Sequence, residues 1–133
     1  MKQTLIEKAK EAMQRAYAPY SSFKVGAALL CSDGSIYTGC NIENASFSPT
    51  VCAERVALFK AVSDGKREFS AIAVCGGKDG VLTDNYCYPC GVCRQVLSEF
   101  CKEDFKIYVM SRDDVKEYTM SQLLPNGFGS SIL

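Results

Sequence analysis

The chain has 133 residues, a length that fits one domain with a substantial core. Its 15 basic and 15 acidic residues balance, so it lacks the net basic charge typical of nucleic-acid-binding proteins. No apolar run approaches the roughly 20 residues of a membrane-spanning helix, and the N-terminus has no apolar signal-peptide core. We therefore expect a cytoplasmic protein with one domain, residues 1–133, and neither a membrane nor a nucleic-acid partner.

The first elements expected are a helix and an antiparallel pair of strands. Thr4 and Glu7 have the spacing of a capping box, and apolar residues recur at helical spacing over residues 4–16. Residues 23–31 are mainly apolar and lead into a turn signal, after which residues 35–40 return as a second strand.

The rest of the chain alternates between strands and helices. The pattern predicts a loop at 41–50, helices at 52–64 and 90–100, strands at 70–75, 105–110 and 115–119, and a helical turn at 121–124. Two β–helix–β units favour a partly parallel sheet. The expected fold class is α/β, a three-layer helix–sheet–helix sandwich with a mixed sheet of about five strands. The helix at 52–64 is apolar on nearly every side, which favours an oligomer that covers it.

The absence of histidine restricts the chemistry of the chain. It excludes Ser-His-Asp and Cys-His nucleophilic sites and imidazole acid–base catalysis. A metal must then be held by sulfur or oxygen, and thiolates favour zinc or an iron–sulfur cluster. Cys52 together with Cys90 and Cys93 can hold one zinc ion per chain and leave its fourth tetrahedral position for water.

Glu54 and two arginines lie beside these cysteines in the sequence. Glu54 follows Cys52 by two residues, near enough to transfer protons without being a ligand. The alternative for Glu54 is a carboxylate that only stabilises a helix N-terminus. Three thiolates weaken zinc as a Lewis acid, so compensation by hydrogen bonds to sulfur is expected from Arg55 and, as a second candidate, Arg94. A surface salt bridge is the alternative for both.

The remaining cysteines have simpler interpretations. Cys31, Cys40 and Cys75 lie in apolar, strand-like runs, and with Cys101 they are expected to be small buried apolar residues. Cys87 lies close to the proposed metal pair, so a disulfide or a ligand exchange there stays open.

The pattern Cys-x-Glu followed by Pro-Cys-x-x-Cys is the three-cysteine form of the zinc deaminase signature. The chain resembles the cytidine deaminase family, in particular its small homotetrameric members, over roughly residues 17–128. The segments that carry the resemblance occur in family order and are Phe23–Leu29, Asn41–Ser46, Val51–Arg55, Cys90–Leu97, and Leu123–Pro125 with the following Phe128. The resemblance implies hydrolytic deamination of cytidine and deoxycytidine to uridine and deoxyuridine, in pyrimidine salvage, with Glu54 as the catalytic acid and base.

The resemblance also implies how the nucleoside is held. Asn41 and Glu43 match residues that bind the ribose hydroxyls, Phe23 matches one that packs against the nucleoside, and backbone groups at Ala53 match those that recognise the pyrimidine. Phe128 matches a phenylalanine that reaches the active site of a neighbouring subunit in the homotetramer. A turn role for Asn41 and a core role for Phe23 remain the alternatives.

The chain departs from the family pattern at the edge of the site. Phe47 and Pro49 stand where tyrosine and glycine are common, and Tyr88 stands where serine is common. These departures leave the substrate breadth open. The alternative functions are a structural zinc module with Cys87 as a fourth ligand, a thiol–disulfide enzyme, and a deaminase of a related nucleoside such as blasticidin S.

Overall fold

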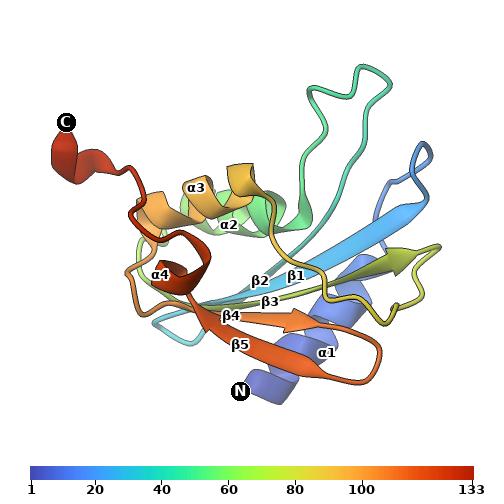
Figure 1. The fold of residues 1–133 in the computed structure, drawn as a ribbon, viewed down its shortest axis with the longest axis horizontal. Helices are drawn as coiled ribbons and strands as arrows, with labels where there is room; N and C mark the ends of the chain where they lie inside the picture. Colours follow the sequence, from blue (N-terminus) through green and yellow to red (C-terminus); the bar gives the residue numbers. More distant parts are fainter.

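The computed structural model describes residues 1–133 as one five-stranded sheet with helices on both faces (Figure 1). The strand order is β2-β1-β3-β4-β5, with bounds β1 Phe23–Cys31, β2 Ile36–Cys40, β3 Phe69–Lys78, β4 Lys106–Met110 and β5 Val115–Thr119. β3 and β4 pair in parallel, and every other neighbouring pair is antiparallel. The prediction of a mixed five-stranded sheet is confirmed.

The helices form two layers, one on each face of the sheet. They are α1 Lys2–Met13, α2 Ala53–Ser63, α3 Gly91–Phe100 and α4 Met120–Leu123, followed by the 3₁₀ turn η1 Ser130–Ile132. α1 covers one face, and α2, α3 and α4 lie on the other (Figure 1). Side chains alternate along β3, so that Ala73 packs in the α1 core while Ile72 and Val74 pack in the core under α2 and α3. The three-layer sandwich is thus the observed architecture.

This topology brings the starts of α2 and α3 together. β2 connects through α2 to β3, and β3 connects through α3 to β4. Because β3 and β4 run parallel, their carboxyl ends lie at the same edge of the sheet, and α3 begins near that edge. The loop that precedes α3 is held there by a hydrogen bond from the Cys87 amide to the Met110 carbonyl, 3.2 Å long, at the end of β4. Functional sites in α/β sheets commonly form at such carboxyl edges.

Two details of the expected elements are wrong. α1 begins at Lys2 with Met1 as its N-cap and no side-chain cap, so Thr4 and Glu7 do not form a capping box. β3 continues beyond its expected end at residue 75, through Gly76 and Gly77. The glycines are needed because the following loop folds closely over the strand: a Cβ on Gly77 would lie 1.7 Å from the Val81 carbonyl oxygen.

α2 packs on β2 at Gly39, where the helix backbone touches the strand. A Cβ on Gly39 would lie 2.4 Å from the Ala53 carbonyl oxygen and 2.5 Å from the Ala57 nitrogen. Gly39→Ala should therefore lower the free energy of unfolding by about 1–3 kcal/mol, because backbone atoms cannot move aside as a flexible side chain can. Urea denaturation measures the change. Gly129→Ala is the matched control, since nothing lies within 4 Å of a Cβ at Gly129. Equal stability of the two variants would contradict this close packing.

Candidate metal centre

Three cysteine sulfurs from two separate segments meet at the starts of α2 and α3. Cys52 is the N-cap of α2, Cys90 is the N-cap of α3, and Cys93 lies buried in the first turn of α3. Their Sγ atoms all lie within 4.8 Å of one another, and those of Cys52 and Cys90 are 3.7 Å apart. A tetrahedral zinc ion with bonds of about 2.3 Å holds two sulfurs about 3.8 Å apart. The cluster therefore fits zinc as three of its four ligands.

The surroundings of Cys52 favour a thiolate, whereas hydrogen bonding with Cys52 and burial raise the pKa of Cys93. The Cys93 amide donates to the Cys90 Sγ at 3.5 Å, and the Arg55 Nη2 donates to the Cys52 Sγ at 3.5 Å. Hydrogen bonding from Cys93, with a smaller contribution from Arg55, lowers the pKa of Cys52 to about 5. Helix N-termini and neighbouring cations are the usual means of stabilising a thiolate in a protein. The structure thus places Arg55, unlike a surface arginine, directly on a ligand sulfur.

Glu54 lies inside the protein next to these sulfurs. It is only 3% exposed, and its Oε1 has no hydrogen-bond partner. Burial raises the pKa of Glu54 to about 7, and a hydrogen bond from its own backbone amide acts in the opposite direction. A buried carboxyl oxygen without a partner is costly, so this atom is available to a ligand or water in the site. A carboxylate that only stabilised the helix N-terminus would not need to be buried.

Asn41 joins the end of β2 to the start of β1. Its Nδ2 donates to the Phe23 carbonyl and its Oδ1 accepts from the Val25 amide, both at 2.8 Å. The side chain is 8% exposed, so the amide is fixed in orientation. One N–H and one lone pair remain free for a ligand.

Glu43 is held by the turn that precedes β1. Its Oε1 accepts from the Tyr20 amide at 2.9 Å and the Ser21 amide at 3.1 Å, and its Oε2 accepts from the Ser21 hydroxyl. These bonds, with the Ser21 hydroxyl contributing most, lower the pKa of Glu43. Sequence reasoning missed Tyr20 and Ser21 as supports, because a turn segment gives no signal of the carboxylate that it will bind.

Phe23 and Phe47 both expose aromatic surface beside these residues. The Phe23 ring is 40% exposed and lies against Gly76, which also faces Cys87, so Phe23 is not a core residue. Phe47 is 72% exposed and packs edge-on against Tyr20, with ring centroids 6.2 Å apart. The rings of Tyr20 and Phe47, together with Glu43, line a cavity of about 320 Å³. Phe47 thus supplies an apolar wall where the family pattern has a hydroxyl.

Three other residues that the sequence singled out are not part of the sulfur cluster. Cys87 is not part of the three-sulfur group; it is partly buried, and desolvation raises its pKa to about 12. Arg94 donates to the Pro89 and Leu123 carbonyls, and no hydrogen bond joins it to a sulfur, so its expected role as a second compensating charge is wrong. Phe128 lies along the second half of α3, in the C-terminal segment that projects away from the sheet (Figure 1).

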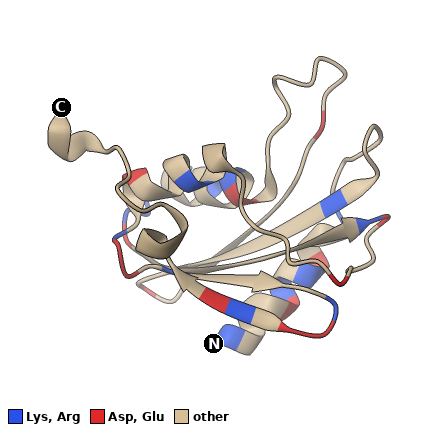
Figure 2. Cartoon of the chain, viewed as in Figure 1, with Lys and Arg blue, Asp and Glu red and all other residues tan.

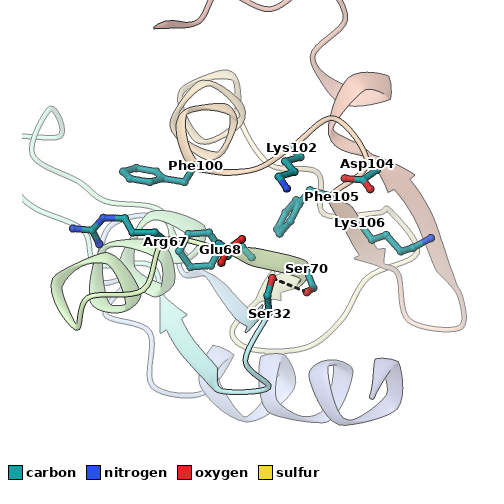
Figure 3. Close-up of a pocket in the computed structure, with 10 residues that line it drawn as sticks. Ser32, Arg67, Glu68, Ser70, Phe100, Lys102, Asp104, Phe105 and Lys106 are labelled. Carbon is teal, nitrogen blue, oxygen red and sulfur yellow. Dashed lines mark hydrogen bonds between the residues drawn. The ribbon is translucent and has the colours of Figure 1, made fainter. Parts of the chain in front are cut away.

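Neither the charge distribution nor a cavity at the opposite edge of the sheet resembles the sulfur site. Figure 2 shows basic and acidic residues interspersed along α1 and β5. A separate cavity of about 330 Å³ opens at the starts of β3 and β4, the edge opposite the sulfur cluster (Figure 3). Its lining carries charges of both signs, including Arg67, Glu68, Lys102 and Asp104, and no cysteine. The helices of the fold are all too short or too polar to cross a bilayer.

The three-thiol assignment predicts the metal content of single variants. Cys93→Ser should lose most of its zinc, because a neutral hydroxyl is a poor zinc ligand and the site would keep only two thiolates. Cys40→Ser is the control, since Cys40 is partly exposed and lies outside the sulfur cluster. Elemental analysis of the purified proteins gives zinc per chain. Full zinc content in Cys93→Ser would show that the cluster is not the site.

Comparison with known proteins agrees with this geometry. Residues 1–109 match the cytidine and deoxycytidylate deaminase zinc-binding region. A cytidine deaminase of Sporosarcina psychrophila is 50% identical over 130 residues, 97% of this chain and 92% of the relative. A cytidine deaminase of Halalkalibacterium halodurans is 51% identical over 128 residues, 96% and 93% of the two chains. The crystal structure of a cytidine deaminase from Burkholderia pseudomallei superposes with a TM-score of 0.89 at 46% identity, covering 96% of this chain and 99% of that one. The chain therefore belongs to the cytidine and deoxycytidylate deaminase family.

Proposed function

We propose that this protein deaminates cytidine and deoxycytidine to uridine and deoxyuridine, with release of ammonia, at a zinc ion held by Cys52, Cys90 and Cys93. The observation that carries the proposal is the buried Glu54 carboxyl, which has an unpartnered oxygen beside three clustered sulfurs. Membership of the deaminase family supports the same reaction. A purely structural zinc site would have no use for a buried carboxyl without a partner.

Glu54 is the residue that moves protons in this proposal. Zinc, when bound, makes a water molecule acidic enough to supply a nucleophile near neutral pH. Glu54 would take one proton from the attacking water and deliver it to N3 as the water oxygen bonds to C4 of the cytosine ring. It would then take the remaining proton from that oxygen and deliver it to the amine as the C4–N bond breaks, which releases ammonia. Its position at the start of α2, two residues after Cys52, keeps the carboxyl beside the metal without making it a ligand.

Arg55 and the two helix starts offset the charge of the ligands. Three thiolates around a dication leave a net charge of about −1, which opposes the acidification of water. Arg55 donates to the Cys52 Sγ, and Cys52 and Cys90 both lie at positive helix ends. These contacts draw electron density away from the sulfurs and restore the strength of zinc as a Lewis acid.

The sugar and base are assigned to four residues, of which Glu43 also lines the cavity formed with Tyr20 and Phe47. Glu43 and the free hydrogen-bonding groups of Asn41 are directed to the ribose hydroxyls, Phe23 to the nucleoside, and the backbone at Ala53 to the pyrimidine. Support comes from the fixed orientation of Asn41 and Glu43 and from the exposed ring of Phe23. The cavity lining contains no lysine or arginine, which favours an unphosphorylated nucleoside.

We further propose a homotetramer whose subunits share active sites. The Phe128 ring is 55% exposed and lies on the opposite part of α3 from its own sulfur cluster. A second exposed apolar region on α2 and its neighbours includes Val51, Val56 and Phe59, and Phe59 is 48% exposed. Burial of these side chains against other copies of the chain accounts for both features.

The proposal also includes a single domain over residues 1–133 and a cytoplasmic location. All eight cysteines are free, including the pair Cys90 and Cys93. Free thiols in this number favour the cytoplasm over an oxidising compartment, where disulfides form. The two cores share a single sheet, which favours one domain over residues 1–133.

Substitution of the proposed proton carrier separates catalysis from metal binding. Glu54→Gln should keep its zinc and lose turnover of cytidine by about 10²–10⁴-fold or more, because the amide cannot accept and deliver a proton. Uridine formation, followed by absorbance, gives the rate, and elemental analysis gives the zinc content. Turnover close to that of the wild type would exclude Glu54 as the acid and base.

Subunit sharing can be tested by mixing two inactive variants. Glu54→Gln lacks the proton carrier and Phe128→Ala lacks the proposed contribution from the neighbour. Co-refolded mixed tetramers should regain activity, because some sites then combine an intact Glu54 with an intact Phe128 from another chain. Each variant refolded alone is the control. If Phe128 acted within its own chain, mixing would restore nothing.

A further inference from the structure

We propose that Arg94 is a positioning residue of the metal centre, which holds the Cys90 ligand in place by binding two backbone carbonyls from different parts of the chain. The inference rests on the metal centre of the proposed function. The sequence placed Arg94 near the metal as a compensating charge, and its contacts give it a different role.

The contacts of Arg94 are with backbone only. Its Nε donates to the Pro89 carbonyl at 2.8 Å, and its Nη1 donates to the Leu123 carbonyl at 2.9 Å. The ion pairs of the structure join other residues, so no carboxylate competes for this guanidinium. A planar guanidinium presents its N–H groups in fixed directions, and hydrogen bonds from a charged donor are stronger than neutral ones. Arg94 therefore fixes the two carbonyls relative to each other.

Cys90 is the ligand that most needs such support. Cys93 is buried within α3 and Cys52 is partly buried, whereas Cys90 is exposed. Cys90 also follows residues 79–89, which contain no helix or strand. The Pro89 carbonyl and the Cys90 nitrogen belong to one planar peptide group, so holding the carbonyl also sets the direction in which the Cys90 backbone continues. Arg94 thus restrains the most exposed of the three cysteines.

The second carbonyl connects the metal loop to the C-terminal segment. Leu123 is the last residue of α4, where helix carbonyls lack partners within the helix and the dipole favours a cation. The next residue of α3, Gln95, donates from its Nε2 to the Phe128 carbonyl at 3.0 Å. Two consecutive side chains of α3 therefore hold both ends of the segment 123–128. The same segment carries the exposed Phe128 ring.

A second contact holds the loop of residues 79–89 that precedes Cys90. The Tyr88 and Tyr118 hydroxyls lie 3.0 Å apart, and their rings pack edge-on with centroids 5.7 Å apart. This contact joins the residue before Pro89 to β5 and does not involve Arg94. Loss of Arg94 should therefore loosen the loop without unfolding the domain.

Zinc release from the loaded protein tests the proposal. Arg94→Met keeps the length of the side chain without its donors, and should release zinc to a chromogenic chelator about tenfold to a hundredfold faster than the wild type, the effect usual for residues that support metal ligands. Arg94→Lys keeps the charge but cannot span both carbonyls, and should give an intermediate rate. Arg67→Met is the control: Arg67 also donates to two backbone carbonyls, those of Val62 and Lys66, but at the edge of the sheet opposite the sulfur cluster.

A cobalt-substituted protein gives a second readout that does not depend on turnover. The visible bands of tetrahedral cobalt bound by thiolates should shift or broaden in Arg94→Met and return toward the wild type in Arg94→Lys. Zinc release changed by less than about twofold, with an unchanged cobalt spectrum, would overturn the proposal. If circular dichroism shows Arg94→Met to be unfolded, the same comparison with Arg94→Lys decides. A protein that passes these tests but leaves cytidine unchanged would refute the proposed function and not this inference.

Discussion

The structure depends on keeping three thiolates close together. The sulfurs of Cys52, Cys90 and Cys93 lie within 4.8 Å of one another, and as anions they would repel strongly in a partly buried site. Two helix N-termini and the Arg55 guanidinium supply positive potential at the sulfurs, and a bound dication supplies the rest. The Glu54 carboxyl lies in the same site, where burial raises its pKa to about 7.

The arrangement of the helix starts is a consequence of close packing on the sheet. α1 approaches β1 at Gly26, where a Cβ would lie 2.1 Å from the Ala9 carbonyl oxygen, and α2 approaches β2 at Gly39 in the same way. Glycine at both positions lets helix backbone rest directly on strand backbone. The metal centre is therefore positioned by contacts on rigid elements, although Cys52 and Cys90 each follow a loop. Cys90 is the exposed one of the two, which gives the backbone contacts of Arg94 their importance.

The residues assigned to the nucleoside are held in place before any ligand binds. Asn41 is fixed by two backbone groups of β1, and Glu43 by the turn that contains Tyr20 and Ser21. Fixed polar groups bind a ligand with a smaller loss of conformational entropy than mobile ones. The exposed Phe47 ring adds apolar surface at the same place. The structure therefore combines polar side chains of fixed orientation with an exposed aromatic ring, and this ring, Phe47, is where the chain departs from the family pattern.

The sequence by itself determined the sheet strands to within one or a few residues, and it singled out the pair Cys90 and Cys93 that the structure places in the sulfur cluster, since period-two and period-3.6 patterns and the spacing Cys90-x-x-Cys93 are local properties. The family pattern added the link between Cys52 and that pair. Contacts between distant segments could not be predicted in this way. The extension of β3 through Gly77 depends on a loop folding over it, and the partners of Arg94 are backbone carbonyls that no side-chain pattern reveals. Backbone groups are alike at every residue, so only the tertiary structure decides which of them meet a given side chain.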